Sequence, residues 1–76
     1  MTAKHVALCD RLQRFGFTEG NQMRLYGEVF VFLSEPIVMT DDVVLVDATE
    51  RKTGQKRRVR IPLPIVNMAG ADRKVA

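Results

Sequence analysis

Two runs of residues, 43–51 and 56–63, flank a short polar connection that contains Gly54. A glycine in a short polar connection between two such runs is typical of a β-hairpin. Basic residues are also concentrated here, because six of the ten residues from Arg51 to Arg60 are Arg or Lys. The chain is therefore predicted to be organised around a charged antiparallel hairpin.

The register of this hairpin is predicted from the match between its two runs. With Arg51 opposite Lys56, apolar residues face one another on one side, and an acid twice faces a base, which favours a sheet by roughly 0.2 to 1 kcal/mol per pair. A three-residue loop would instead set Val46 against Arg60, so the burial pattern favours the first register. That register pairs Asp47 with Arg60 and Glu50 with Arg57, and it leaves four bases unpaired near the tip: Arg51, Lys52, Lys56 and Arg58.

The N-terminal part reads as a helix, a loop and a strand. Residues 3–15 have an amphipathic helical period that ends where Gly16 can adopt a left-handed conformation. Residues 23–33 alternate like a strand, and Gly27 suits a bend in a sheet that curls over on itself. Further along, residues 37–39 form a short apolar segment and 40–42 a turn. Residues 65–68 are expected to form a last short strand or turn.

Phe30 and Phe32 lie on a strand face that is polar at its start, so something must cover them. The curled sheet is one candidate, and a second subunit is the other. In the second case the oligomer interface comprises Phe30, Phe32, Ile37 and Met39.

The length of 76 residues is enough for one small domain, with residues 70–76 expected to fray. The predicted fold class is α+β, an N-terminal helix packed on a curved, mainly antiparallel sheet of four or five strands. Closure into a small barrel is a variant of this fold. Cys9 is the single cysteine, which excludes an intramolecular disulfide and a Cys-x-x-Cys zinc site.

Two groups of residues are candidates for chemistry. His5 and Cys9 are four apart on the predicted helix, the minimum for an activated thiolate, but they fall on its apolar face and no third group is spaced to orient the histidine. Glu35, Asp41 and Asp42 lie near a turn but lack the spacing of a calcium loop. A structural role is expected for the first group and a solvated turn for the second. We predict no catalytic residue, no metal site, no cofactor and no enzyme.

Residues 43–48, which follow a helix and short strands and lead into a basic loop, resemble one strand of the Sm-like RNA-binding barrels. The Arg-Gly-x-Asn element of that family is missing, since residues 65–68 contain neither arginine nor glycine. No site residue is therefore transferred from the family.

The predicted function is a non-enzymatic binding module whose hairpin tip contacts nucleic acid or an acidic protein through Arg51, Lys52, Lys56 and Arg58. Basic residues on the first helix extend this surface if the helix packs beside the hairpin: Lys4, Arg11 and Arg14. The alternatives are a solvated hairpin end and a homo-oligomerising interaction module. The net charge of +3 is too mild to decide between them. The expected location is cytoplasmic, without membrane insertion, because the longest apolar run is far short of a membrane span.

Overall fold

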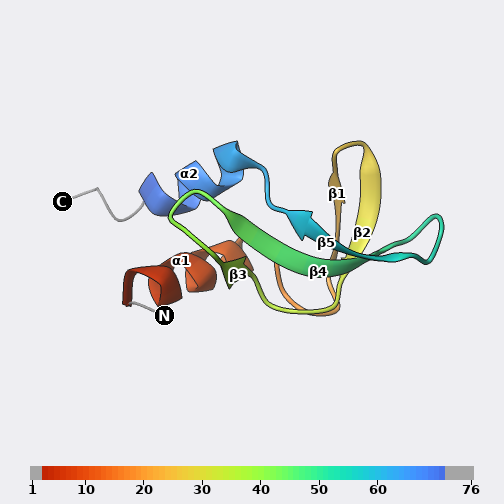
Figure 1. Cartoon of the computed structure of the whole chain (residues 1–76), viewed down its shortest axis with the longest axis horizontal. Coiled ribbons are helices and arrows are strands. Elements are labelled where there is room, and N and C mark those ends of the chain that lie inside the picture. Colours follow the sequence, from red (N-terminus) through yellow and green to blue (C-terminus); the bar gives the residue numbers. More distant parts are fainter. Residues whose placement is uncertain (1–2, 72–76) are drawn as a thin grey trace.

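A computed structural model of the chain describes residues 3–71 and shows two helices and a five-stranded antiparallel sheet (Figure 1). The predicted α+β class is confirmed. In chain order the elements are α1 (Ala3–Arg14), β1 (Gln22–Leu25), β2 (Glu28–Phe32), β3 (Ile37–Val38), β4 (Val44–Glu50), β5 (Lys56–Arg60) and α2 (Leu63–Ala71).

β4 is the central strand of the sheet. β2 and β3 follow one another along one of its edges, β5 lies along the other, and β1 pairs with the far side of β2. The sheet is not closed into a barrel, because β1 and β5 do not pair with each other. Its two edges are nevertheless linked by a hydrogen bond. The Tyr26 hydroxyl in the β1–β2 turn donates to the Arg60 carbonyl at the end of β5, at 2.6 Å. The sheet is therefore curved but open.

α1 ends as its sequence predicts. The amide of Gly16 donates to the Gln13 carbonyl at 3.0 Å, and that of Phe17 donates to the Leu12 carbonyl at 3.1 Å. These two bonds form a Schellman motif, which requires a left-handed residue, and Gly16 has a φ of 114°. A Cβ at this position would also lie 2.9 Å from the terminal methyl group of Met23, which would have to shift.

The single bent strand predicted for residues 23–33 is two strands joined by a tight turn. Leu25 pairs with Glu28 across the two-residue connection Tyr26-Gly27, whose φ values are 54° and 79°. Two positive φ values are those of a type I′ hairpin turn. This turn is hard to recognise in the sequence, because asparagine or aspartate, and not tyrosine, usually precedes the glycine. The reversal places Met23 opposite Phe30, so residues of opposite parity share one face.

The C-terminal part differs from the prediction. Residues 65–68 belong to α2 and not to a strand or turn, and Gly70 lies in the same helix. Pro62 accepts the first helical bonds, from the amides of Ile65 and Val66. Pro64 fits in the first turn because the amides there have no helical partner. The expected fraying of residues 72–76 lies outside the described residues.

The core lines the concave face of the sheet and continues between the two helices at one end of the molecule (Figure 1). Its members are each at most 6% exposed: Leu8, Leu12, Phe17, Leu25, Phe30, Phe32, Val44, Val46, Ala48, Val59, Ile61, Val66 and Ala69. The rings of Phe17 and Phe32 stack with their centroids 5.2 Å apart. Phe30 and Phe32 are thus covered by their own chain, and their placement in an oligomer interface is corrected. Ile37 is half-buried and Met39 is exposed.

Candidate functional site

The β4–β5 hairpin forms as predicted, but its register is shifted by two residues. Asp47 lies opposite Arg58 and not Arg60, and Thr49 takes the place of Arg51 opposite Lys56. The connection keeps its four residues but moves one position toward the N-terminus, because the Glu50 amide donates to the Gln55 carbonyl at 2.8 Å and the Gly54 amide donates to the Glu50 carbonyl at 2.7 Å. Gly54 adopts a φ of 74°. A shift of two leaves every side chain on its original face, so the burial pattern could not distinguish the two registers.

On the concave face of the hairpin, Arg57 binds Glu50. The guanidinium donates to the Glu50 carboxylate at 2.8 Å and lies 3.8 Å from Glu28. The Glu50 side chain is only 9% exposed. The hydrogen bond from Arg57 lowers the pKa of Glu50 despite the opposing effect of desolvation. The predicted Glu50–Arg57 ion pair is therefore present, and it holds a carboxylate at the margin of the core.

On the convex face, Arg58 binds Asp47 at 2.9 Å. This hydrogen bond lowers the pKa of the carboxyl and raises that of the guanidinium. Both side chains remain partly exposed to solvent. The expectation that Arg58 is unpaired is wrong, because the shifted register places Asp47 directly across the ladder from it.

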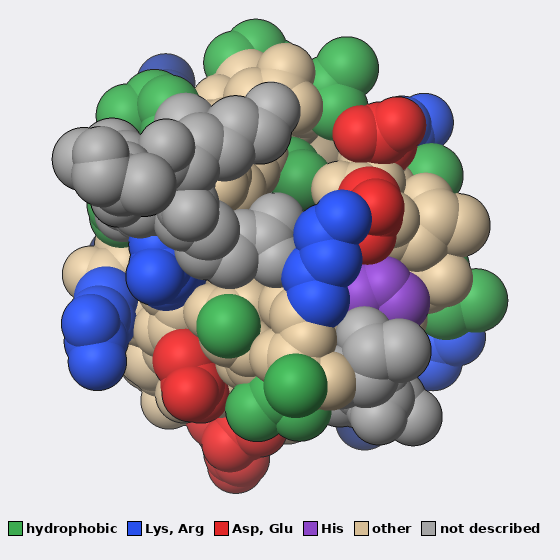
Figure 2. Space-filling model, turned by 90° about the vertical axis from the view of Figure 1, so that its left-hand side faces the viewer, with side chains coloured by type: hydrophobic (Ala, Val, Ile, Leu, Met, Phe, Trp, Pro, Cys, Tyr) green, Lys and Arg blue, Asp and Glu red, His purple; other side chains and the backbone are tan. Residues whose placement is uncertain are grey.

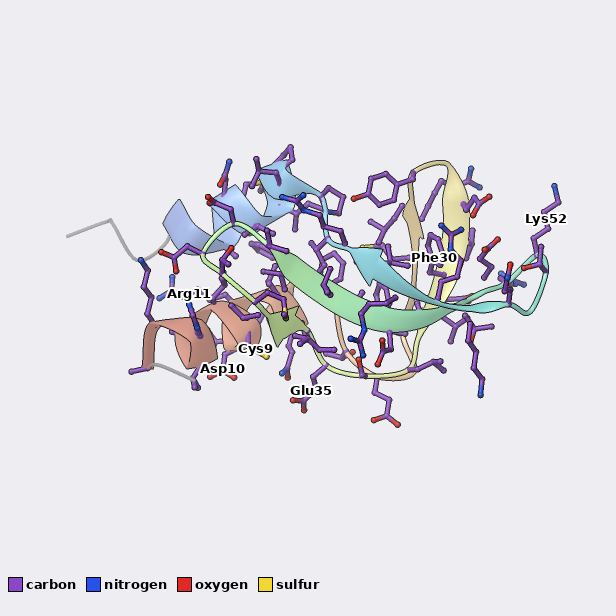
Figure 3. The ribbon with its side chains drawn as sticks, in the orientation of Figure 1. Cys9, Asp10, Arg11, Phe30, Glu35 and Lys52 are labelled. Atoms are coloured by element: carbon purple, nitrogen blue, oxygen red, sulfur yellow. The ribbon has the colours of Figure 1, made fainter. Side chains whose placement is uncertain are left out.

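The other three predicted tip bases are exposed: Arg51, Lys52 and Lys56. Within residues 3–71, none of the three forms an ion pair with a carboxylate. Arg51 makes one long hydrogen bond, from Nη1 to the Gln22 side chain at 3.4 Å. Lys52 projects from the hairpin tip, at the end of the molecule opposite α1 (Figure 3). The tip is therefore a cluster of uncompensated positive charge.

The strand pairings continue this cluster across the convex face of the sheet. Arg24 on β1 pairs with Val29 on β2, and the Arg51 amide donates to the Val29 carbonyl at 3.0 Å. In the next row Gln22, Val31, Thr49 and Lys56 lie side by side. The following row comprises Leu33, Asp47 and Arg58. We call these three rows the convex surface; it has aliphatic residues along β2 and bases on both sides.

Two open hollows lie on or beside this surface. The first, about 430 Å³, is lined by Leu33, Asp47, Lys56, Arg57 and Arg58. The second, about 490 Å³, is lined by Gly27, Glu28, Val29, Arg51 and Lys52. Each hollow therefore combines an aliphatic residue of β2 or its continuation with bases of the β4–β5 hairpin. Sequence reasoning missed them, because Val29 and Leu33 precede the hairpin by more than ten residues.

The bases of α1 do not extend the tip surface. α1 lies at one end of the molecule and the β4–β5 tip at the other (Figure 1), and the greatest dimension is 43 Å. Lys4 binds Asp41 at 2.8 Å. The extension predicted through Lys4, Arg11 and Arg14 is therefore corrected.

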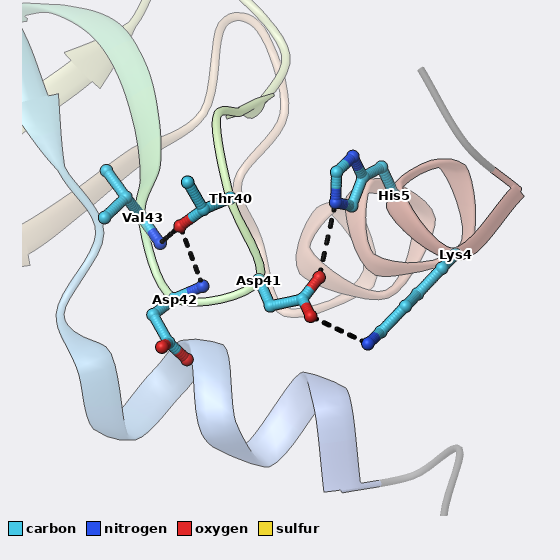
Figure 4. A network of polar contacts seen from close by, with 6 residues as sticks. All are labelled: Lys4, His5, Thr40, Asp41, Asp42 and Val43. Carbon is cyan, nitrogen blue, oxygen red and sulfur yellow. Dashed lines mark hydrogen bonds and ion pairs between the residues drawn. The ribbon is translucent and has the colours of Figure 1, made fainter.

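His5 and Cys9 help attach α1 to the rest of the chain. The His5 ring lies 3.3 Å from Asp41, which Lys4 also contacts (Figure 4). The hydrogen bond from Lys4 is the main cause of the lowered pKa of Asp41. The histidine lies beside acidic and basic side chains on the face seen in Figure 2. The Cys9 thiol donates to the Pro36 carbonyl at 3.5 Å and accepts from Gln13 at 3.4 Å. Asp41 is a third group near His5 that the sequence did not indicate.

The predicted turn at residues 40–42 is present. The Thr40 hydroxyl accepts from the amides of Asp42 and Val43, at 3.2 and 3.0 Å (Figure 4). Across the described part of the chain, no three His, Cys, Asp or Glu side chains gather as metal ligands. The same residues contain no helix whose length and apolar character would suit a membrane span.

Comparison with known proteins adds no relative: no protein-family model, curated protein or solved structure matches the chain.

Proposed function

We propose that the chain is a non-enzymatic binding module that contacts the phosphates of a nucleic acid through the tip of the β4–β5 hairpin. The main observation that supports this proposal is that Arg51, Lys52 and Lys56 are exposed and, within residues 3–71, form no ion pair. Like charges held close together repel unless an anion lies between them, and phosphates are the anions that such clusters commonly bind.

The contrast with Arg57 and Arg58 supports this assignment. Each of these two bases has a carboxylate within 3 Å, at 2.8 and 2.9 Å respectively, so its charge is already compensated within the chain. Arg58 was predicted to bind the ligand as an equal member of the set. Arg58 is expected to contribute less to phosphate binding than the other three bases, because a phosphate would have to compete with Asp47 for its guanidinium group.

The proposal is tested by titrating a labelled oligonucleotide at two salt concentrations. Release of counterions makes the logarithm of the affinity fall linearly with the logarithm of the salt concentration, with a slope that grows with the number of phosphates contacted. We expect Arg51→Ser/Lys52→Ser/Lys56→Ser to weaken binding and to make this slope shallower by roughly two to three.

A matched control removes equal charge at the other end of the molecule, in Lys4→Ser/Arg11→Ser/Arg14→Ser. Affinity close to that of the native chain is expected for this control. Equal weakening by both triple variants would show that net charge alone drives binding. Absence of binding by the native chain at low salt would overturn the proposed function.

An oligomerising interaction module is the second candidate, favoured by exposed apolar side chains outside the hairpin. Met39 is 56% exposed and Met68 is 61% exposed. With Phe30 and Phe32 in the core, the predicted interface is reduced to Ile37 and Met39. A molar mass from light scattering tests this candidate, and a monomer at high concentration would remove it.

A further inference from the structure

We propose that the convex surface binds single-stranded nucleic acid in preference to duplex. The nucleobases would lie against the aliphatic residues of β2 and its continuation, and the phosphates would contact the arginine and lysine side chains on either side. This inference rests on the proposed function and extends it from the hairpin tip to the neighbouring strands β2 and β1. It names the form of nucleic acid and adds Arg24, Val29 and Leu33 to the site.

The first support is the order of residues across the sheet. Val29 lies between Arg24 on β1 and Arg51 at the end of β4. Because neighbouring strands are about 4.8 Å apart, the backbones of Arg24 and Arg51 lie roughly 10 Å apart with the valine between them. A ligand that reached both guanidinium groups would therefore also cover an aliphatic side chain.

The second support is the lining of the two hollows. Val29 shares one with Arg51 and Lys52, and Leu33, which is 42% exposed, shares the other with Lys56 and Arg58. Of the two acidic residues in these linings, Asp47 is compensated by Arg58 at 2.9 Å, and Glu28 lies 3.8 Å from Arg57, which also binds Glu50. Both hollows thus offer an apolar contact beside positive charge.

This combination distinguishes single strands from duplexes. A duplex presents phosphates on its outside and keeps the faces of its nucleobases stacked within. It would therefore contact the arginine and lysine side chains of this surface, and the aliphatic residues of the surface would have no suitable partner. A single strand can turn unstacked bases toward an apolar surface while its backbone follows a positively charged path. Aliphatic contacts are weaker than stacking on aromatic rings, so modest affinity is expected.

The experiment compares single-stranded and duplex oligonucleotides of equal length at low salt, using the full chain. We expect the single strand to bind more tightly, and Val29→Ser/Leu33→Ser to reduce its affinity by about tenfold, because two apolar contacts are lost. Val6→Ser is the control for an exposed valine outside the surface, on α1, where Val6 is 48% exposed. Circular dichroism checks that each variant is folded.

A second matched pair keeps the test independent of those two substitutions. Arg24→Ser and Arg14→Ser each remove one exposed arginine, the first from the convex surface and the second from α1. Only Arg24→Ser is expected to weaken single-strand binding. Equal affinity for both oligonucleotides, with no effect of Arg24→Ser or Val29→Ser/Leu33→Ser, would overturn this inference and leave the tip proposal standing. Absence of binding to either oligonucleotide would overturn both.

Discussion

The concave and convex faces of β4 carry charged residues of the same types in different surroundings. On the concave face Val44, Val46 and Ala48 are buried and lead to Glu50, which is itself 6% exposed. On the convex face Leu45, Asp47 and Thr49 are half-buried. Both faces hold an Arg–carboxylate pair of nearly equal length, 2.8 Å for Arg57–Glu50 and 2.9 Å for Arg58–Asp47.

The difference shows that contact distance does not reveal what an ion pair does. A carboxylate at the margin of the core has lost most of its water, so it depends on its arginine. A carboxylate on an open face remains hydrated, and its pair with arginine contributes little to stability. We therefore assign Arg57 to the fold, whereas three bases of the convex surface, Arg24, Arg51 and Lys56, are exposed and form no ion pair within residues 3–71.

The largest expected effect separates the two faces at adjacent residues of β2. Phe32→Ala removes a ring that is 1% exposed and stacked on Phe17, so it should lower the free energy of unfolding by about 3–5 kcal/mol. Val31→Ala, on the convex face, should cost less than about 1 kcal/mol. Urea denaturation measures both, and Phe32→Leu provides a milder substitution if Phe32→Ala does not fold. Equal costs at both positions would contradict the assignment of faces.

A second comparison removes each arginine in turn. Arg57→Met leaves the Glu50 carboxylate without its closest cation, whereas Arg58→Met leaves a carboxylate that water can reach. The thermal midpoint should fall more for Arg57→Met than for Arg58→Met, although each loses the same charge and gains the same side chain. The reverse order would break the distinction between the two pairs.

Acid should destabilise the folded chain through these carboxylates. The pKa values of Glu50 and Asp47 are lowered from their ordinary values of 4.5 and 3.8 by Arg57 and Arg58 respectively. A lowered pKa contributes stability that is fully present above the ordinary value and is lost as the pH falls through the lower folded-state value. The thermal midpoint should therefore decline below about pH 4.5. The decline should be shallower in Arg57→Met, and a parallel decline would contradict this cause.

The smallest effect concerns the link between the β1–β2 turn and β5. Tyr26→Phe removes the 2.6 Å hydrogen bond to the Arg60 carbonyl and leaves the ring in place. The expected loss is about 1 kcal/mol in the free energy of unfolding. Amide hydrogen exchange should increase at the end of β5 if this bond holds the curved sheet in shape. Unchanged exchange would show that the curvature is independent of Tyr26.

Local chemistry made part of this structure predictable. Gly16 ends α1 because a Schellman motif needs a left-handed residue, and the runs on either side of Gly54 form a hairpin because their alternation matches the period of a strand. The burial of Phe30 and Phe32 also followed from their apolar character, with cover by their own chain as one of the two alternatives. Tyr26-Gly27 was missed because tyrosine is an unusual residue in a type I′ turn, and α2 was missed because a short, uniformly apolar segment shows no period.

By itself the sequence determined the α+β class, the helix end at Gly16, the basic hairpin and the face on which each of its side chains lies. Those features depend on neighbouring residues and on a two-residue alternation. Only the tertiary structure decided that Asp47 meets Arg58 and not Arg60, that the phenylalanines are covered by their own chain, and that Val29 and Leu33 lie beside the hairpin bases. A register shift of two preserves every face, and contacts between distant strands depend on how the sheet curves, so neither is determined by local pattern.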